Sequence, residues 1–175
     1  MVQDSTRWLS EAEFLAQPES TERIELIDGE VIVSPSVPFA HQRLVGRLCV
    51  ALDGWAAENG AEVGIAPLDI RFGPSRILQP DLAVFLGGLP ADVEMPLARV
   101  PELCIEVLST NRDYDRRTKR LVYADAGVVE LWLVAPEGQI ERWSGEKLAG
   151  GERAEDPLRS PVLNGFELPF GVLFR

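Results

Sequence analysis

Two acidic residues, Asp81 and Glu106, stand out because each accompanies a short apolar run that is typical of a buried strand. Glu106 interrupts the run 103–108, and Asp81 directly precedes the run 82–86. A charge that points from a central strand into apolar surroundings is costly unless a cation, a metal or a proton neutralises it. We therefore expect Glu106 to have such a partner, and we expect the two acids to converge at one edge of a sheet.

A pair of carboxylates of this kind is suited to a divalent metal. Mg²⁺ and Mn²⁺ prefer hard oxygen ligands, and Mg²⁺ usually combines one or two protein carboxylates with waters and a substrate phosphate. Lys119 follows Glu106 on a helical pattern and is near enough in sequence to fold back over the same edge, where it could stabilise an attacking water. Competing site types are poorly supported, because the chain has one histidine, two cysteines without metal-ligand spacing and no glycine-rich phosphate loop.

Both Asp81 and Lys119 also fit a purely structural interpretation. Asp81 follows Pro80, and this dipeptide is common in turns. Lys119 lies in a charged helical segment, where it could be a solvated side chain that pairs only with Asp115, four residues earlier. Glu106 is harder to explain by structure alone than either Asp81 or Lys119.

The order of the predicted elements indicates an α/β protein with a central mixed β-sheet flanked by helices. Asp28-Gly29 between two apolar strands, 24–27 and 30–33, predicts an N-terminal β-hairpin. An apolar stripe predicts a helix from His41 to about residue 59. A strand, a helix and a strand at 103–108, 113–126 and 129–134 form a βαβ pattern, which implies a parallel pair. Further strands are expected at 62–66, 68–72, 82–86 and 139–143.

Two more polar residues deserve consideration as members of the site. His41, the single histidine, opens the 41–59 helix and fits a helix start as well as a site group. Glu25 lies in the first hairpin strand. Alternation along that strand favours a solvent-facing Glu25, opposite buried Ile24 and Leu26.

Length and composition indicate one globular domain over residues 1–175. Seventeen basic and twenty-eight acidic residues give a net charge of −11, which counts against indiscriminate binding of nucleic acid. Between Arg112 and Arg120, however, five basic residues accompany two acidic ones, so we expect a local basic patch beside the suspected site. Cys49 and Cys104 lie among apolar residues and are expected to be free thiols. The chain shows neither a secretory signal nor eighteen consecutive apolar residues, so we expect a cytoplasmic protein that does not enter membranes.

An ordered set of short motifs resembles the Uma2 family, part of the PD-(D/E)xK nuclease superfamily with the restriction-endonuclease-like fold. The resemblance is strongest over residues 22–143. The matching motifs are Ile24-Glu25-Leu26-Ile27-Asp28-Gly29-Glu30, His41, Gln79-Pro80-Asp81, Pro101-Glu102-Leu103, Ile105-Glu106-Val107-Leu108-Ser109, Asp115 with Lys119 and Tyr123, and Ala126-Gly127-Val128 through Glu130, Trp132 and Val134.

This resemblance implies roles for individual residues. Asp81 matches the aspartate of the PD motif and Glu106 matches the following acid, so both would hold Mg²⁺ or Mn²⁺ with help from the Val107 backbone carbonyl. Leu108 stands where the superfamily has its lysine. Within the family the lysine is found on the next helix, which makes Lys119 the equivalent residue.

The same resemblance implies that Glu25 supports the metal site and that His41 occupies a position where the family usually has histidine. The implied activity is a divalent-metal-dependent endonuclease that hydrolyses DNA phosphodiester bonds. Proteins of this fold commonly form homodimers, so a homodimer is also implied.

Two other functions remain open. The acidic net charge and the displaced lysine favour a nuclease fold that no longer cuts and serves as a binding or regulatory module. An acidic surface is also no obstacle to a metal-dependent hydrolase that acts on a smaller phosphate ester. DNA binding with a steep salt dependence would distinguish the small-ester hydrolase from the other two.

Overall fold

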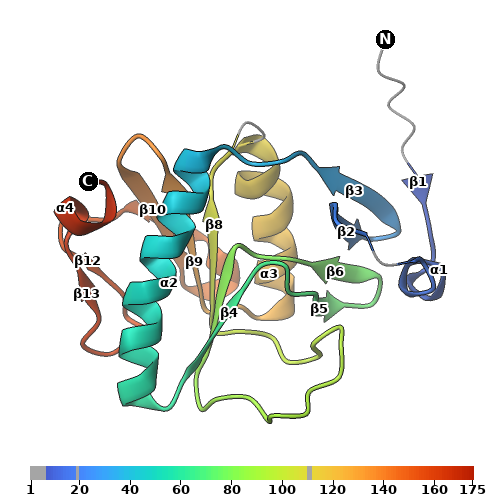
Figure 1. Cartoon of the computed structure of the whole chain (residues 1–175), viewed down its shortest axis with the longest axis horizontal. Helices are drawn as coiled ribbons and strands as arrows, with labels where there is room; N and C mark the ends of the chain where they lie inside the picture. Colours follow the sequence, from blue (N-terminus) through green and yellow to red (C-terminus); the bar gives the residue numbers. More distant parts are fainter. Residues whose placement is uncertain (1–6, 19, 110–111) are drawn as a thin grey trace.

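The computed structural model describes residues 7–18, 20–109 and 112–175, and it contains two main β-sheets (Figure 1). The larger sheet is mixed, has six strands and runs in the order β11-β10-β9-β8-β7-β4. Its strands are β4 (Glu62–Ile65), β7 (Leu82–Phe85), β8 (Leu103–Val107), β9 (Glu130–Ala135), β10 (Gln139–Ser144) and β11 (Gly150–Arg153). The pair β8 and β9 is parallel, as the βαβ pattern predicts, and the other neighbours in this sheet are antiparallel.

The second sheet was only partly anticipated. Its order is β1-β3-β2-β6-β5, with β1 (Arg7–Trp8), β2 (Arg23–Ile27), β3 (Glu30–Ser34), β5 (Ile70–Gly73) and β6 (Arg76–Leu78). The predicted hairpin is confirmed, because β2 and β3 pair through a turn in which Asp28 and Gly29 both have positive φ, 52° and 97°. The hairpin does not stand alone, however. β2 also pairs with β6, a strand that the sequence pattern did not predict.

Helices cover both faces of the larger sheet (Figure 1). α2 (Phe39–Asn59) places its apolar stripe, with Leu44, Leu48 and Leu52, against one face. It ends at Gly60, whose left-handed conformation (φ 63°) suits a helix C-terminus. On the other face, Val122 and Tyr123 of α3 (Arg120–Ala126) belong to a second apolar cluster. The central mixed sheet flanked by helices is therefore confirmed.

The predicted 113–126 helix contains two kinds of turn. Its first part, η1 (Tyr114–Lys119), is a π-helix, and α3 continues from Arg120. π-Helical turns are rare in proteins, and those that do occur are often found at functional sites. The remaining short elements are α1 (Glu11–Leu15), the 3₁₀ turn η2 (Glu146–Leu148), α4 (Phe170–Leu173) and the strand pair β12 (Leu158–Arg159) and β13 (Glu167–Leu168).

Strand register brings the two suspected acids together. Leu82 of β7 lies opposite Ile105 of β8 in an antiparallel pair. Asp81 precedes Leu82 and Glu106 follows Ile105, so the register places both acids at the same end of the two strands. The predicted convergence of Asp81 and Glu106 at one edge of the sheet is therefore confirmed.

Both cysteines are free, with Cys104 buried and Cys49 partly buried. None of the helices in the described part of the chain has the length and apolar character needed to cross a membrane.

Candidate active site

Asp81 lies just before β7 and uses both of its carboxylate oxygens. Its Oδ1 accepts a hydrogen bond from Arg23 Nη1 at 2.7 Å. Its Oδ2 lies 3.1 Å from His41 Nε2 and accepts a bond from the Val107 amide at 2.8 Å. Burial raises the pKa of Asp81, but the His41 hydrogen bond and the charge of Arg23 outweigh it and lower the pKa to about 2. Asp81 is therefore an ionised acceptor near neutral pH.

Glu106 of β8 is only 2% exposed and has cationic partners, as its position in an apolar run predicts. Its Oε1 accepts hydrogen bonds from Lys119 Nζ at 3.0 Å and from the Tyr123 hydroxyl. Its Oε2 lies 3.6 Å from Arg23 Nη2. Burial, assisted by the charge of Asp81, raises the pKa of Glu106 to about 8 in spite of Lys119. The two neighbouring carboxyl groups thus have pKa values displaced in opposite directions, a pattern found in acid–base sites.

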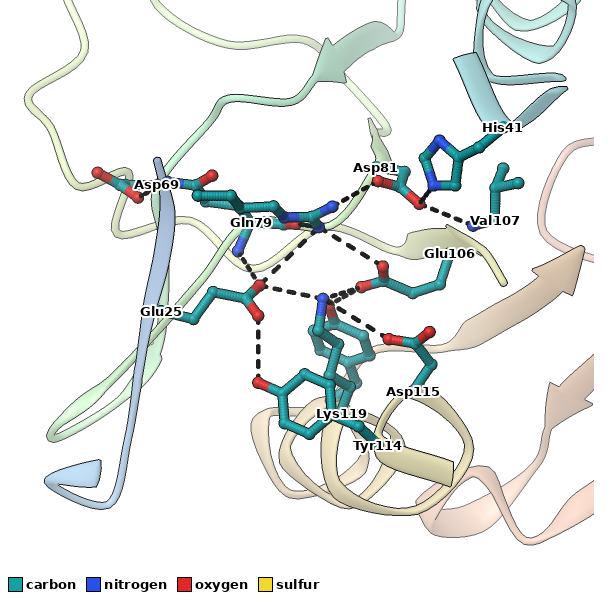
Figure 2. Close-up of polar contacts among 12 residues, drawn as sticks. Glu25, His41, Asp69, Gln79, Asp81, Glu106, Val107, Tyr114, Asp115 and Lys119 are labelled. Atoms are coloured by element: carbon teal, nitrogen blue, oxygen red, sulfur yellow. Dashed lines mark hydrogen bonds and ion pairs between the residues drawn. The ribbon is translucent and has the colours of Figure 1, made fainter. Parts of the chain in front are cut away.

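Lys119 ends the π-helical turn and points into the interior toward Glu106 and Asp115 (Figure 2). Its Nζ lies 3.0 Å from Glu25 Oε1, 3.0 Å from Glu106 Oε1 and 4.0 Å from Asp115 Oδ1. Burial lowers the pKa of Lys119, but the charges of Glu106 and Glu25 more than offset this and raise it. The interpretation of Lys119 as a solvated side chain paired only with Asp115 is wrong, because this turn packs its lysine against two strands.

Glu25 of β2 is fully buried and joins the same cluster. Its Oε1 accepts a hydrogen bond from the backbone N–H of Gln79 at 2.8 Å, and its Oε2 accepts one from the Tyr114 hydroxyl at 3.1 Å (Figure 2). The solvent-facing interpretation of Glu25 is therefore wrong. Alternation correctly separates the two faces of β2, but the second sheet places the Glu25 face against η1, so both faces of the strand are covered.

Arg23 is a site residue that the sequence analysis missed. Its side chain lies on the same face of β2 as that of Glu25, two residues away. The guanidinium group lies within 4 Å of the carboxylates of Glu25, Asp81 and Glu106. Besides its bond to Asp81, it donates to the Gln79 carbonyl oxygen. Burial lowers the pKa of Arg23, but the charges of Glu106, Asp81 and Glu25 outweigh this and raise the pKa above its usual value, so the guanidinium group stays cationic. The spacing of two residues from Glu25 was the signal that could have found it.

The carboxylates fit a metal site of limited size. Asp81 Oδ1 and Glu106 Oε2 both face Arg23, which shows that the two oxygens are directed at one shared cation. Within residues 7–18, 20–109 and 112–175, no three side chains of His, Cys, Asp or Glu gather closely enough to form a metal cluster. Two carboxylates satisfy the usual protein share of a Mg²⁺ shell, the rest being water and substrate phosphate. Asp81 and Glu106 would hold such an ion in place of their present contacts with Arg23.

A large pocket leads to this cluster from outside. Its volume is about 930 Å³, and Arg23, His41 and Asp81 lie in its wall. Three buried polar atoms at the site have no hydrogen-bond partner among the described residues: Arg23 Nε, His41 Nδ1 and Gln79 Oε1. Buried polar atoms are normally satisfied, so these three are suited to bind water or a ligand. Neutral polar side chains contribute to the lining, namely Ser20, Thr21, Ser34, Ser36 and Gln42, together with Glu22 and apolar residues such as Val33, Val45 and Ile65.

The basic patch predicted between Arg112 and Arg120 is largely neutralised. Arg112 forms an ion pair with Glu137, and Arg116 forms one with Glu141. Lys119 is buried. Charge counting along the sequence did not detect these partners because both acids come from the strand–turn–strand region that follows α3.

A family model matches most of the chain. Residues 11–171 match the model of the Uma2 family, which is described as "putative restriction endonuclease". The chain belongs to the Uma2 family. This match is longer than the 22–143 region in which the sequence motifs of Uma2 are strongest, and it takes in the strands of both sheets except β1.

A solved structure shows the same fold. It is described as a "putative nuclease belonging to DUF820" from Anabaena variabilis ATCC 29413, and it superposes on this Uma2 chain with a TM-score of 0.79 at 21% sequence identity. The alignment covers 95% of this chain and 97% of the other. Among curated proteins, none matches the chain.

Proposed function

We propose that this Uma2 chain is a divalent-metal-dependent endonuclease that hydrolyses DNA phosphodiester bonds. The observation that carries the proposal is the adjacent pair Asp81 and Glu106, with Lys119 bound to Glu106 and a large pocket opening beside Asp81. Family membership favours the same chemistry, since the Uma2 model is described as "putative restriction endonuclease".

Asp81 and Glu106 would hold Mg²⁺ or Mn²⁺, with the Val107 carbonyl as a backbone ligand. The Val107 amide already bonds Asp81, which keeps this part of the backbone against the carboxylate. When bound, such an ion lowers the pKa of a water and neutralises charge on the phosphate.

Lys119 would stabilise the attacking water and the negative charge that grows on the phosphate. Its ammonium group is held from two sides by Glu25 and Glu106, which fixes its position before substrate arrives. His41 would orient Asp81 through Nε2, leaving Nδ1 available for a water or substrate oxygen.

Arg23 would have two successive roles. Without a metal, its guanidinium group neutralises Asp81 and Glu106. Once a divalent ion takes over that task, the planar guanidinium is free to donate paired hydrogen bonds to a substrate phosphate. Its place in the pocket wall favours this second role.

A cleavage assay tests the proposal directly. Supercoiled plasmid and single-stranded DNA are incubated at low salt with Mg²⁺ or Mn²⁺, using the wild type, Asp81→Asn and Asp125→Asn prepared identically. Asp125 is a suitable control because it is exposed and pairs with Arg76 and Lys147, neither of which belongs to the candidate site. We expect the wild type and Asp125→Asn to cut and Asp81→Asn to be inactive. Equal cutting by all three would contradict the assignment of the site.

A second candidate is a hydrolase of a smaller phosphate ester. The pairing of Arg112 and Arg116 with acids, together with the net charge of −11, reduces the positive surface that a DNA duplex needs. DNA affinity measured from 50 to 200 mM salt separates the two functions, because only phosphate-backbone binding weakens steeply. Metal binding without turnover of either substrate would instead identify a binding module.

A further inference from the structure

The outer face of α2, which points away from the large sheet, carries a regular stripe of six exposed residues. Successive members are spaced by four or three residues, which is the heptad spacing of paired helices. All six are exposed, in contrast to the buried leucines on the opposite side of α2. The stripe consists of Phe39, Arg43, Gly46, Val50, Asp53 and Ala57.

The stripe is apolar at its most exposed points. α2 forms an outer layer on the large sheet, and on its outer face Phe39 is 78% exposed and Val50 is 77% exposed (Figure 1). A Cβ atom added at Gly46 would meet nothing within 4 Å, so the helix surface is open there. Arg43 lies over the Phe39 ring at 6.0 Å and therefore belongs to the same surface.

We propose that this stripe is the contact surface for a second copy of the chain, with the two α2 helices antiparallel about a twofold axis. The two charges of the stripe select this arrangement. If the axis crosses α2 at the level of residue 48, each Arg43 meets Asp53 of the second copy, which gives two symmetric ion pairs. Parallel helices would place Arg43 against Arg43 and Asp53 against Asp53. Opposite charges at a helix seam are a known means of fixing orientation.

The same register also matches side-chain sizes. Val50 meets Gly46 of the second copy, so a branched side chain faces the open glycine surface. Phe39 meets Ala57, again a large residue against a small one. The contact is isologous, since every pair occurs twice. A single helix pair lies at the small end of stable interfaces, so association should depend on concentration.

The arrangement has a consequence for the two sites. His41 is only 3% exposed and is not a member of the stripe, so the proposed contact does not involve this site residue. In the antiparallel register the two His41 residues are separated by about 21 Å along the helix axes, from fourteen residues of helix rise. The proposal does not depend on the nuclease assignment, and either can fail alone.

Sedimentation velocity of the full chain over a range of concentrations tests the contact. We expect the wild type to dimerise, and Arg43→Asp and Asp53→Arg each to raise the dissociation constant by roughly tenfold or more, because each brings like charges together. An equimolar mixture of these two variants should regain dimers, since one then carries only acids and the other only bases at the paired positions. Glu58→Arg, an exposed change on the same helix outside the stripe, should leave association unchanged.

Three results would overturn the proposal. These are a wild type that stays monomeric at all concentrations, a dimer that neither single variant weakens, and a mixture that associates no better than its components. Thermal unfolding of each variant shows whether the fold is intact. Val50→Asp provides a second test, because it places charge opposite Gly46 without touching the ion pairs.

Discussion

Glu106 and Glu130 lie on neighbouring parallel strands and are both buried, with 2% and 0% exposure, yet their surroundings differ in kind. Glu130 accepts its hydrogen bonds from neutral donors: its Oε1 accepts from Trp132 Nε1 at 2.8 Å, and its Oε2 accepts from the Ser160 hydroxyl, while Arg142 Nε lies 3.9 Å from Oε1 without a hydrogen bond. Glu106 instead accepts a hydrogen bond from the buried ammonium group of Lys119 and lies 3.6 Å from Arg23. Burial raises the pKa of both glutamates, so the direction of the shift does not distinguish them.

The difference between the two glutamates lies in what surrounds each group. Ser160 also accepts hydrogen bonds from the amides of Val162 and Leu163, so Glu130 fastens a C-terminal segment to the sheet. Parallel register puts Glu130 opposite Leu103, at the far end of the strands from Glu106. A buried carboxylate alone therefore does not identify a site. Several mutually close charges beside a pocket are the feature that sets Glu106 apart from Glu130.

The largest expected effect is on catalysis. Glu106→Gln should reduce DNA cleavage by at least about 100-fold, because it replaces a proposed metal ligand. Glu130→Gln should leave cleavage within a few-fold of wild type and lower the free energy of unfolding by about 1–3 kcal/mol, because an amide cannot accept both of its hydrogen bonds. Single-turnover cleavage and urea unfolding measure the two quantities. Similar losses of cleavage in both variants would remove the distinction drawn between the two glutamates.

A second effect is on stability. Lys119→Met keeps the apolar stem but leaves Glu25 and Glu106 without their shared ammonium group, so the free energy of unfolding should fall by about 3–5 kcal/mol. The matched change near Glu130 is Arg142→Met. Because Arg142 lies 3.9 Å from Glu130 and is partly exposed, this change should cost less than about 1 kcal/mol. Urea unfolding in metal-free buffer compares them, and equal losses would mean that the Lys119 contacts are energetically ordinary.

A third effect concerns metal affinity. Arg23→Gln removes the cation that Asp81 and Glu106 share, so the affinity for Mn²⁺ should rise by roughly tenfold, equivalent to about 1.4 kcal/mol. Isothermal titration calorimetry without DNA measures this separately from activity. Arg142→Gln serves as the control and should create no new binding beside Glu130. An unchanged or weaker affinity in Arg23→Gln would mean that Arg23 does not occupy the metal position.

The smallest expected effect is on the pH dependence of stability. Burial raises the pKa of Glu106 from 4.5 to about 8 and that of Asp115 from 3.8 to about 6, so folding favours the protonated forms. Their stabilising contribution is complete below the unfolded pKa values and is lost as pH rises toward 8. Asp81 acts in the opposite direction, but only at acidic pH, because its pKa is lowered from 3.8 to about 2.

Melting temperatures in metal-free buffer should therefore decline from pH 5 to pH 8. Glu106→Gln should flatten this decline. Glu130→Gln should retain most of it, since the cluster around Lys119 remains intact. A wild-type profile that rises with pH would show that Glu106 stays ionised through its contact with Lys119.

Local signals were sufficient for most of the elements. Turn chemistry and periodicity within one segment predicted the Asp28-Gly29 hairpin, the βαβ order and the buried leucine stripe of α2. All three are present. The π-helical turn was not predictable in this way. Its pattern of backbone hydrogen bonds differs from that of an α-helix, while the apolar spacing of the segment does not record that difference.

The sequence by itself determined that Asp81 and Glu106 are unusual, because a carboxylate beside or within an apolar strand has no solvent to stabilise it. Only the tertiary structure decided which groups neutralise them. Alternation shows which residues share a face of a strand, but it does not show what covers that face. Alternation therefore placed Glu25 in solvent, although the Uma2 resemblance placed it at the site. Arg23 was missed and the burial of Lys119 was not foreseen, since all three depend on the second sheet packing against η1.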